Sequence, residues 1–226
     1  MPRADGAVRV VMETGGRLTF ASALDWPGWA RAGRGDEAAL ATLRAFHSRY
    51  APVARAAGLA LPEVATFEVV ERLRGTATTD FGAPDVIAAS ERAPLAADEV
   101  DRLVRLLEAC WEVFDQAVAG APASLRKGPR GGGRDRDTVV QHVHGAEHQA
   151  TARVGLRLPV PALDDLSART AARAALVEAL RATAGAAPPP EGARTWPPRY
   201  VIRRLAWHVL DHAWEIEDKS HPVPDA

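Results

Sequence analysis

The pattern of apolar and polar positions begins with two short segments that have the character of β-strands. Residues 8–14 (VRVVMET) and 17–23 (RLTFASA) are rich in β-branched and aromatic side chains. Gly15 and Gly16 lie between them, and a Gly-Gly pair is a typical two-residue hairpin connection. The pattern therefore predicts two strands that pair antiparallel.

A helical spacing follows. From Asp36, which can cap a helix, apolar side chains recur at helical intervals until Gly58 ends the pattern, and Pro52 is where such a helix would kink or restart. Residues 66–73 (TFEVVERL) alternate well enough to add a strand to the sheet. The predicted order of this first unit is strand, strand, helix, strand.

Four amphipathic segments make up the rest of the chain. They cover residues 100–118, where seven apolar side chains fall at i, i+3, i+4 and i+7, then 138–154, 166–183, and about 198–219. Residues 75–94, rich in turn-formers and small side chains, separate them from the first unit. We predict an α+β module in residues 1–92 and an all-α four-helix bundle in residues 93–226, with at least one crossover connection.

Composition and charge restrict the function. The 226 residues carry 28 Lys and Arg against 29 Asp and Glu, so net charge gives no reason to expect nucleic acid as a partner. No apolar run approaches the ~20 residues of a membrane span, and the first residues lack a signal-peptide pattern, so we expect a cytoplasmic protein with no membrane partner. The single cysteine, Cys110, sits at helical spacing and is predicted to be a packed thiol.

The first unit resembles the HicB-like fold. The hairpin leading into DWPGWARAGRGDEAALATLRAF is similar to the strand, Pro-Gly turn and helix of that family over about 60 residues. The resemblance implies an antitoxin-like binding module, although the DNA-binding segment that many such proteins carry is not evident here. A sheet-helix module that covers or dimerises with its neighbour is an equal alternative. Trp26 and Trp29 could serve in the core or at an interface.

Histidines carry the strongest chemical signal. In AWHVLDHAWEIED, His208 and His212 are four residues apart, so their imidazoles project from one helix face and can chelate one ion. A third ligand must come from another element. The segment VVQHVHGAEHQ supplies His142 and His144 on either side of an apolar stripe, and helical geometry favours His142 only slightly. His144 and His148 form a second HxxxH pair, which can be another site or a solvated face.

The combination TVVQHVHGAEH with RYVIRRLAWHVLDHAWEIED resembles the DinB-like family, including its YfiT and thiol-transferase branches, over roughly residues 95–220. The resemblance implies metal ligands at His142, His208 and His212, with His144 as the alternative, and places Glu147 at the family's acidic position. Glu147 is a candidate general base or orienting partner, or else pairs with another helix. The resemblance also allows a homodimer.

Three imidazoles suit one divalent ion, zinc first, with nickel, iron or manganese as alternatives, and they leave a position open for a small-molecule substrate. In the resembled family, low-molecular-weight thiols are activated for S-transfer or isomerisation. The Ala-, Arg-, Gly- and Pro-rich composition is typical of high-G+C bacteria and favours mycothiol as the thiol. Arg130 and Arg134, in a Gly-rich loop before the His-bearing helix, are candidates for binding a substrate anion, or belong to a solvated connector.

Two other functions remain open from the sequence. One is a metal-dependent hydrolase. The other is a non-catalytic, regulatory protein that acts through the HicB-like module and keeps a vestigial or structural metal site. A fourth side chain such as His144 closing the metal would favour the structural role, whereas an accessible coordination position would favour an enzyme.

Overall fold

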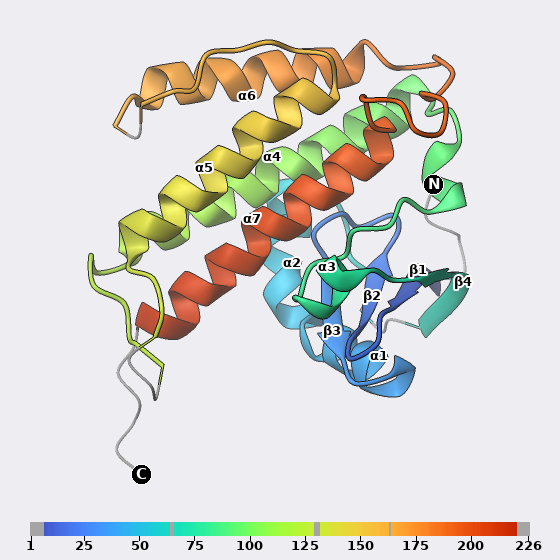
Figure 1. Cartoon of the computed structure of the whole chain (residues 1–226), viewed down its shortest axis with the longest axis horizontal. Coiled ribbons are helices and arrows are strands. Elements are labelled where there is room, and N and C mark those ends of the chain that lie inside the picture. Colours follow the sequence, from blue (N-terminus) through green and yellow to red (C-terminus); the bar gives the residue numbers. More distant parts are fainter. Residues whose placement is uncertain (1–6, 64–65, 129–131, 163, 221–226) are drawn as a thin grey trace.

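The computed structural model describes residues 7–63, 66–128, 132–162 and 164–220 (Figure 1). A four-stranded mixed sheet with two flanking helices comes first, and four long helices that pack together follow it. The predicted fold class, an α+β module followed by an all-α bundle, is therefore confirmed. The division of the chain near residue 93 stays a prediction.

The sheet has the order β3-β2-β1-β4, in which β4 runs parallel to β1 and the other neighbours are antiparallel. The antiparallel pairing of the first two strands is as predicted. The predicted strand order was incomplete, because it lacked β3. That segment, ARAG, has no β-branched residue, and it becomes a strand through its pairing with β2. The strands are β1 (Ala7–Thr14), β2 (Thr19–Ala23), β3 (Ala30–Gly33) and β4 (Thr66–Arg74).

The connection between β1 and β2 is longer than the predicted two residues. The amide of Gly15 donates to the carbonyl of Leu18 at 2.9 Å, and β2 begins only after it. The carboxylate of Asp80 accepts hydrogen bonds from the backbone amides of residues 16–18. These amides are bound by a side chain, so they do not enter the strand ladder.

Two helices replace the single one predicted between residues 36 and 58. They are α1 (Asp36–Ala45) and α2 (His47–Ala56), and the break falls at Phe46, whose φ of −86° and ψ of 3° leave the helical region. Pro52 lies inside α2 and does not end it. Two short turns, α3 (Ala77–Asp80) and η1 (Ala89–Arg92), lead from β4 to the bundle.

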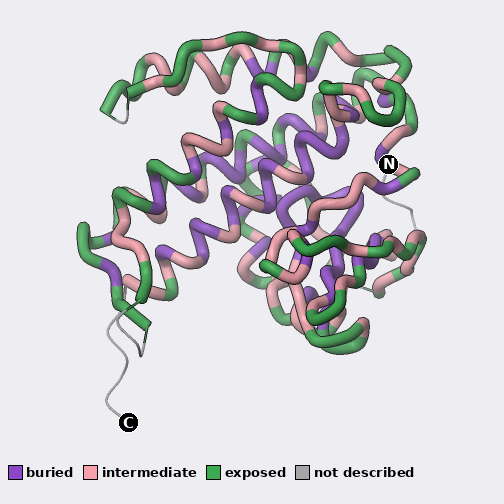
Figure 2. Tube along the Cα trace, in the orientation of Figure 1, coloured by how far each residue is buried: buried purple, intermediate pink, exposed green. Residues whose placement is uncertain are grey.

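The long helices differ strongly in burial. In Figure 2, α4 and α7 are largely buried, whereas α6 is mostly exposed or intermediate along its length. The helix α7 contacts both α4 and α5, and α6 packs against α4 on the outer side of the bundle (Figure 1). The four helices are α4 (Ala97–Gly120), α5 (Arg136–Arg153), α6 (Leu166–Arg181) and α7 (Pro198–Ser220).

One hydrophobic cluster runs from the sheet through α4 to α7. Trp26 and Trp29 belong to it and are 2% and 0% exposed, so both are core residues. Trp29 stacks on Tyr50 at 5.5 Å between ring centroids. An ion pair between Arg31 of β3 and Asp211 of α7, at 2.8 Å, adds a polar link between the sheet and the last helix.

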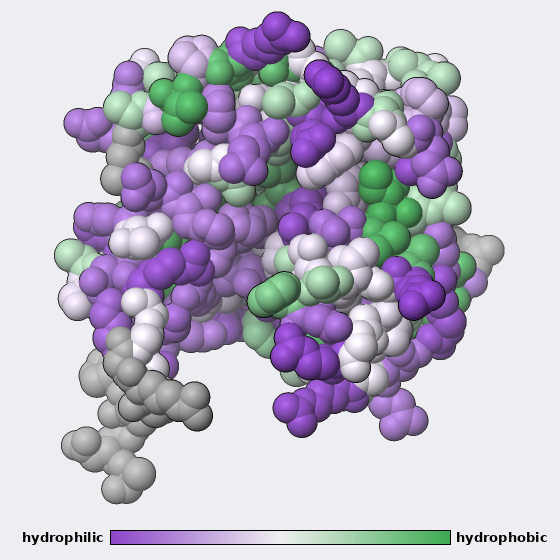
Figure 3. All heavy atoms as spheres, viewed as in Figure 1, coloured by the Kyte–Doolittle hydropathy of each residue, from purple (hydrophilic) through white to green (hydrophobic). Residues whose placement is uncertain are grey.

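Within the described residues, no helix combines the length and the apolar character needed to cross a membrane. The face shown in Figure 3 is mainly hydrophilic over the bundle, and its apolar side chains gather in smaller patches.

Candidate metal centre

The helix α7 presents two of the three predicted ligands on a single face. His208 and His212 are one turn apart, with ring centroids separated by 4.7 Å. Next to them, Trp207 points toward the sheet and packs edge-on against Phe20 at 6.0 Å. The sheet and α4 hold one side of α7, and the two histidines therefore face α5.

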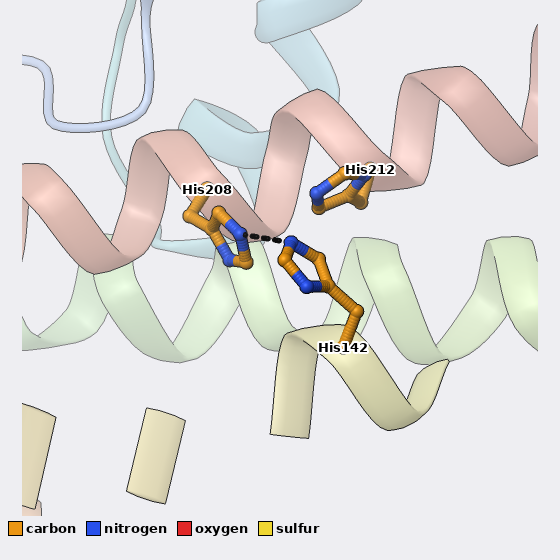
Figure 4. Close-up of side chains that lie close together, drawn as sticks. All are labelled: His142, His208 and His212. Atoms are coloured by element: carbon orange, nitrogen blue, oxygen red, sulfur yellow. Dashed lines mark hydrogen bonds between the residues drawn. The ribbon is translucent and has the colours of Figure 1, made fainter. Parts of the chain in front are cut away.

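The third imidazole comes from α5. The ring of His142 lies 4.9 Å from that of His208 and 5.0 Å from that of His212, measured between centroids (Figure 4). The Nε2 atoms of His142 and His208 are 3.0 Å apart. One ligand atom from each of the three residues lies within 4.8 Å of the others. The structure thus brings together the three histidines that the resemblance indicated.

Burial and mutual proximity favour the neutral form of His142 and His208. Burial, followed by the neighbouring His212, lowers the pKa of His142. The same two causes, burial first, lower the pKa of His208 to about 2. Neutral imidazole is the form that binds a metal, because its ring nitrogen offers a lone pair. His142 and His208 are therefore ready to act as ligands at neutral pH.

Glu215 was not foreseen from the sequence, and it orients the third ring. Its Oε2 lies 2.7 Å from Nδ1 of His212, which leaves Nε2 of that ring as the free nitrogen. The hydrogen bond from His212, with another from Lys219, lowers the pKa of Glu215 to about 2, against the opposing effect of burial. Metal-binding histidines commonly donate their second N–H to such a carboxylate. The signal was its position three residues after His212 on the same helix face.

Of the two arginines considered for substrate binding, only one can be placed. Arg134 lies beside the histidines, with its Nη2 atom 3.2 Å from Oε2 of Glu215, and its side chain is 36% exposed. Its positive charge contributes to the low pKa of both His142 and His208. Arg130 lies outside the described residues.

The remaining candidates lie on another face of α5. His144 is directed toward Phe114, with ring centroids 6.5 Å apart, and is not part of the three-histidine cluster. Glu147 is buried and pairs with Arg173, the shorter of its two contacts being 2.9 Å. It therefore contacts α6 and none of the three histidines.

The donor set fits a divalent cation with an open position. Two nitrogens bound tetrahedrally at ~2.0–2.1 Å from zinc would lie about 3.3 Å apart. The separations here, 3.0 Å for one pair and at most 4.8 Å for the others, require only small side-chain movements. Across the described part of the chain, no fourth His, Cys, Asp or Glu joins the group. The burial of the three side chains grades from exposed at His142 to buried at His212, so the cluster is reachable from solvent on the α5 side.

Comparison with protein families, with curated proteins and with solved structures found no match for this chain. The kinship suggested by the histidine motifs therefore rests on those motifs and on the cluster that they form.

Proposed function

We propose that this protein is a metal-dependent enzyme that holds one divalent cation on His142, His208 and His212 and acts on a low-molecular-weight thiol. The observation that carries the proposal is the convergence of three imidazoles from two helices, with ligand atoms within 4.8 Å and no fourth protein ligand among the described residues. Sites with three protein ligands are typical of catalysis, whereas structural zinc sites are usually closed by a fourth.

The chain supplies the ligands and their orientation. His142 and His208 offer neutral ring nitrogens, and Glu215 holds the ring of His212 through its Nδ1 atom. A divalent ion held there supplies a Lewis acid that lowers the pKa of a water or thiol bound to it. Three imidazoles hold zinc well, and nickel, iron or manganese accept the same ligands.

Thiol chemistry is the preferred subtype, as an S-transfer or isomerisation that uses a mycothiol-like cosubstrate. Support comes from the resemblance to the thiol-transferase branch of DinB-like proteins and from a cation beside the ligands. The guanidinium of Arg134 is partly exposed next to the cluster, where it could pair with an anionic group on the substrate that reacts with the thiol. Hydrolysis of an amide or ester, and a non-catalytic binding role through the sheet module, are the alternatives that the experiments must separate.

Metal binding is tested first. Protein stripped with a chelator and reloaded with zinc should retain close to one ion per chain by elemental analysis. His208→Ala should lose that ion, because two remaining imidazoles bind far more weakly. His144→Ala is the matched control, since it removes an imidazole from the other face of α5 and should leave the metal content unchanged. Equal retention by wild type and His208→Ala would contradict the proposal.

The thiol is tested on a cobalt-substituted sample. Cobalt(II) absorbs visibly, and its spectrum changes when sulfur enters the coordination sphere. Titration with a panel that includes mycothiol, bacillithiol and glutathione should change the spectrum of wild type and not that of His208→Ala. Metal binding with no spectral response to any thiol would refute thiol chemistry while leaving the metal site intact. Ester and amide substrates would then test the hydrolytic alternative.

A further inference from the structure

A second site is suggested by a cavity on the opposite side of α5 from the three histidines. It has a volume of about 290 Å³ and lies between α4, α5 and α6. Its lining includes Trp111, His144, His148, Arg169 and Leu176, and none of the three clustered histidines. A volume of this size is near the lower end of ordinary ligand pockets.

Helix geometry separates the two sites. At about 100° per residue, His142 and His144 lie roughly 160° apart around α5. One therefore faces α7 and the other faces α6, and α5 stands between these two helices in Figure 1. His148 follows His144 by one turn and shares its face.

Three nitrogen atoms in the lining are buried without hydrogen-bond partners among the described residues. They are Nε1 of Trp111, Nε2 of His144 and Nδ1 of His148. Buried polar atoms nearly always have a partner, so three orphans around one cavity call for a bound group. The indole nitrogen can only donate, and each imidazole nitrogen donates in one tautomer. An acceptor group would satisfy all three.

A guanidinium at the cavity adds positive charge. The side chain of Arg169 makes no hydrogen bond or ion pair within the described part of the chain, although its charge acts on both His144 and Glu147. Its neighbour Arg173 already forms two ion pairs, from Nη2 to Oε1 of Glu147 at 2.9 Å and from Nη1 to Oδ2 of Asp115 at 2.8 Å. The charge of Glu147 is thus matched by Arg173, and Arg169 is left for a ligand.

Part of the remaining lining is apolar, and Gln141, Glu147 and Thr151 add polar groups to it. Two apolar residues of the lining differ in exposure. Leu176 is 1% exposed, whereas Val160, also a large hydrophobic residue, is 71% exposed. Pro161 and Ala172 add further apolar surface. We propose that this cavity binds a small organic carboxylate, whose carboxylate is held by Arg169 and the orphan nitrogens and whose apolar body, about the size of a phenyl ring, lies against Val160 and Leu176.

The test uses the intact, zinc-treated protein and a panel of hexanoate, phenylacetate and indole-3-acetate, each paired with its neutral amide. Binding is followed by two-dimensional NMR of the tryptophan indole N–H signals, with Trp111 assigned from a Trp111→Phe sample. Each carboxylate that fits should shift the Trp111 signal and bind more tightly than its amide. If no carboxylate shifts that signal at millimolar concentration, or if carboxylates and amides bind equally, the proposal is overturned.

Variants locate the anion contact. Arg169→Gln should weaken carboxylate binding by about tenfold or more and leave amide binding nearly unchanged, because a charge-assisted hydrogen bond is lost. Arg181→Gln is the matched control, since it makes the same change on α6 about 18 Å further along the helix. If Arg169→Gln and Arg181→Gln bind phenylacetate equally, the assignment of Arg169 is wrong.

A filling variant and a metal-site variant complete the test. Ala172→Leu should abolish binding of both carboxylates and amides, with folding verified by circular dichroism; unchanged binding in the folded variant would overturn the location. His208→Ala should bind phenylacetate as wild type does, because the two sites use different faces of α5. A loss of phenylacetate binding in this folded variant would show that the ligand occupies the metal centre instead.

Discussion

A buried ion pair joins the segment that follows the sheet to the helix that carries two of the clustered histidines. Glu91 of η1 is 0% exposed and Arg203 of α7 is 4% exposed. Their contacts are 2.5 Å from Nε to Oε1 and 3.1 Å from Nη2 to Oε2. The carboxylate also accepts the amide of Ala88 at 2.9 Å, and Nη2 donates to the carbonyl of Val86 at 2.9 Å. Both carboxylate oxygens of Glu91 and two of the three guanidinium nitrogens of Arg203 are therefore engaged.

Replacement of Glu91 by alanine should lower the free energy of unfolding by about 3–5 kcal/mol, because it leaves a guanidinium buried without its counterion. Burial alone would lower the pKa of Arg203, yet the attraction of Glu91 raises it above the ordinary value. Without Glu91, burial is opposed only by the smaller effects of Tyr200 and Glu13 and by the hydrogen bond to the carbonyl of Val86. The loss is a large share of the ~5–15 kcal/mol by which a typical domain is stable.

The assay is urea unfolding of wild type, Glu91→Ala, Arg203→Met and the double variant. The cost of the double variant should fall below the sum of the single costs by about 2–3 kcal/mol, because it leaves no unpaired charge. Asp101→Ala is the control, since its carboxylate is 58% exposed where it pairs with Arg181, and it should cost under about 1 kcal/mol. Additive single effects, or a cost for Glu91→Ala no larger than that of the control, would refute the reasoning.

Three further predictions concern single positions. Hydrogen bonds from loop amides lower the pKa of Asp80. The contribution of this carboxylate to stability is therefore present above its unfolded pKa, about 4, and is lost as the pH falls through its lower folded pKa. The difference in unfolding free energy between wild type and Asp80→Asn should shrink on acidification. Burial raises the pKa of Cys110 and leaves it 0% exposed, so the native protein should not react with Ellman's reagent until urea unfolds it, and rapid native labelling would contradict this. Gly28→Ala should lower the melting temperature more than Gly35→Ala, because φ is near +90° at both but a new Cβ at Gly28 would lie 2.6 Å from Leu210; equal shifts would show that the clash is relieved.

The long helices could be predicted from sequence because their apolar spacing persists over several turns. The helix α4 carries a buried stripe from Val100 to Phe114, and such a period leaves no competing interpretation. Strand β3 could not be predicted, because ARAG has neither a period nor strand-forming residues. It is stabilised by tertiary contacts, since Ala30 packs with Phe20 and with Trp207 of a helix far along the chain. The local sequence pattern does not indicate that contact.

In the candidate site, too, the local features could be predicted from the sequence and the long-range ones could not. The pairing of His208 with His212 depends only on helix periodicity, which a sequence shows directly. The partnership of Glu215 with His212 was also local and could have been found three residues away. The participation of His142 depends on how α5 is rotated against α7, which arises from packing across the bundle.

That rotation also explains why periodicity barely separated His142 from His144. Both histidines flank the buried stripe of α5, which includes Val139 and Val143. A helix that buries such a stripe in a bundle has a neighbouring helix on each side of the stripe. In the bundle, α7 lies beside His142 and α6 lies beside His144. The ambiguity in the sequence therefore corresponds to two different environments. The crowding of histidines around His142 is then no irregularity in a metal motif, because the second HxxxH pair lines a cavity of its own. Since the two faces share one helix, a substitution on either face should be judged by both metal content and carboxylate binding.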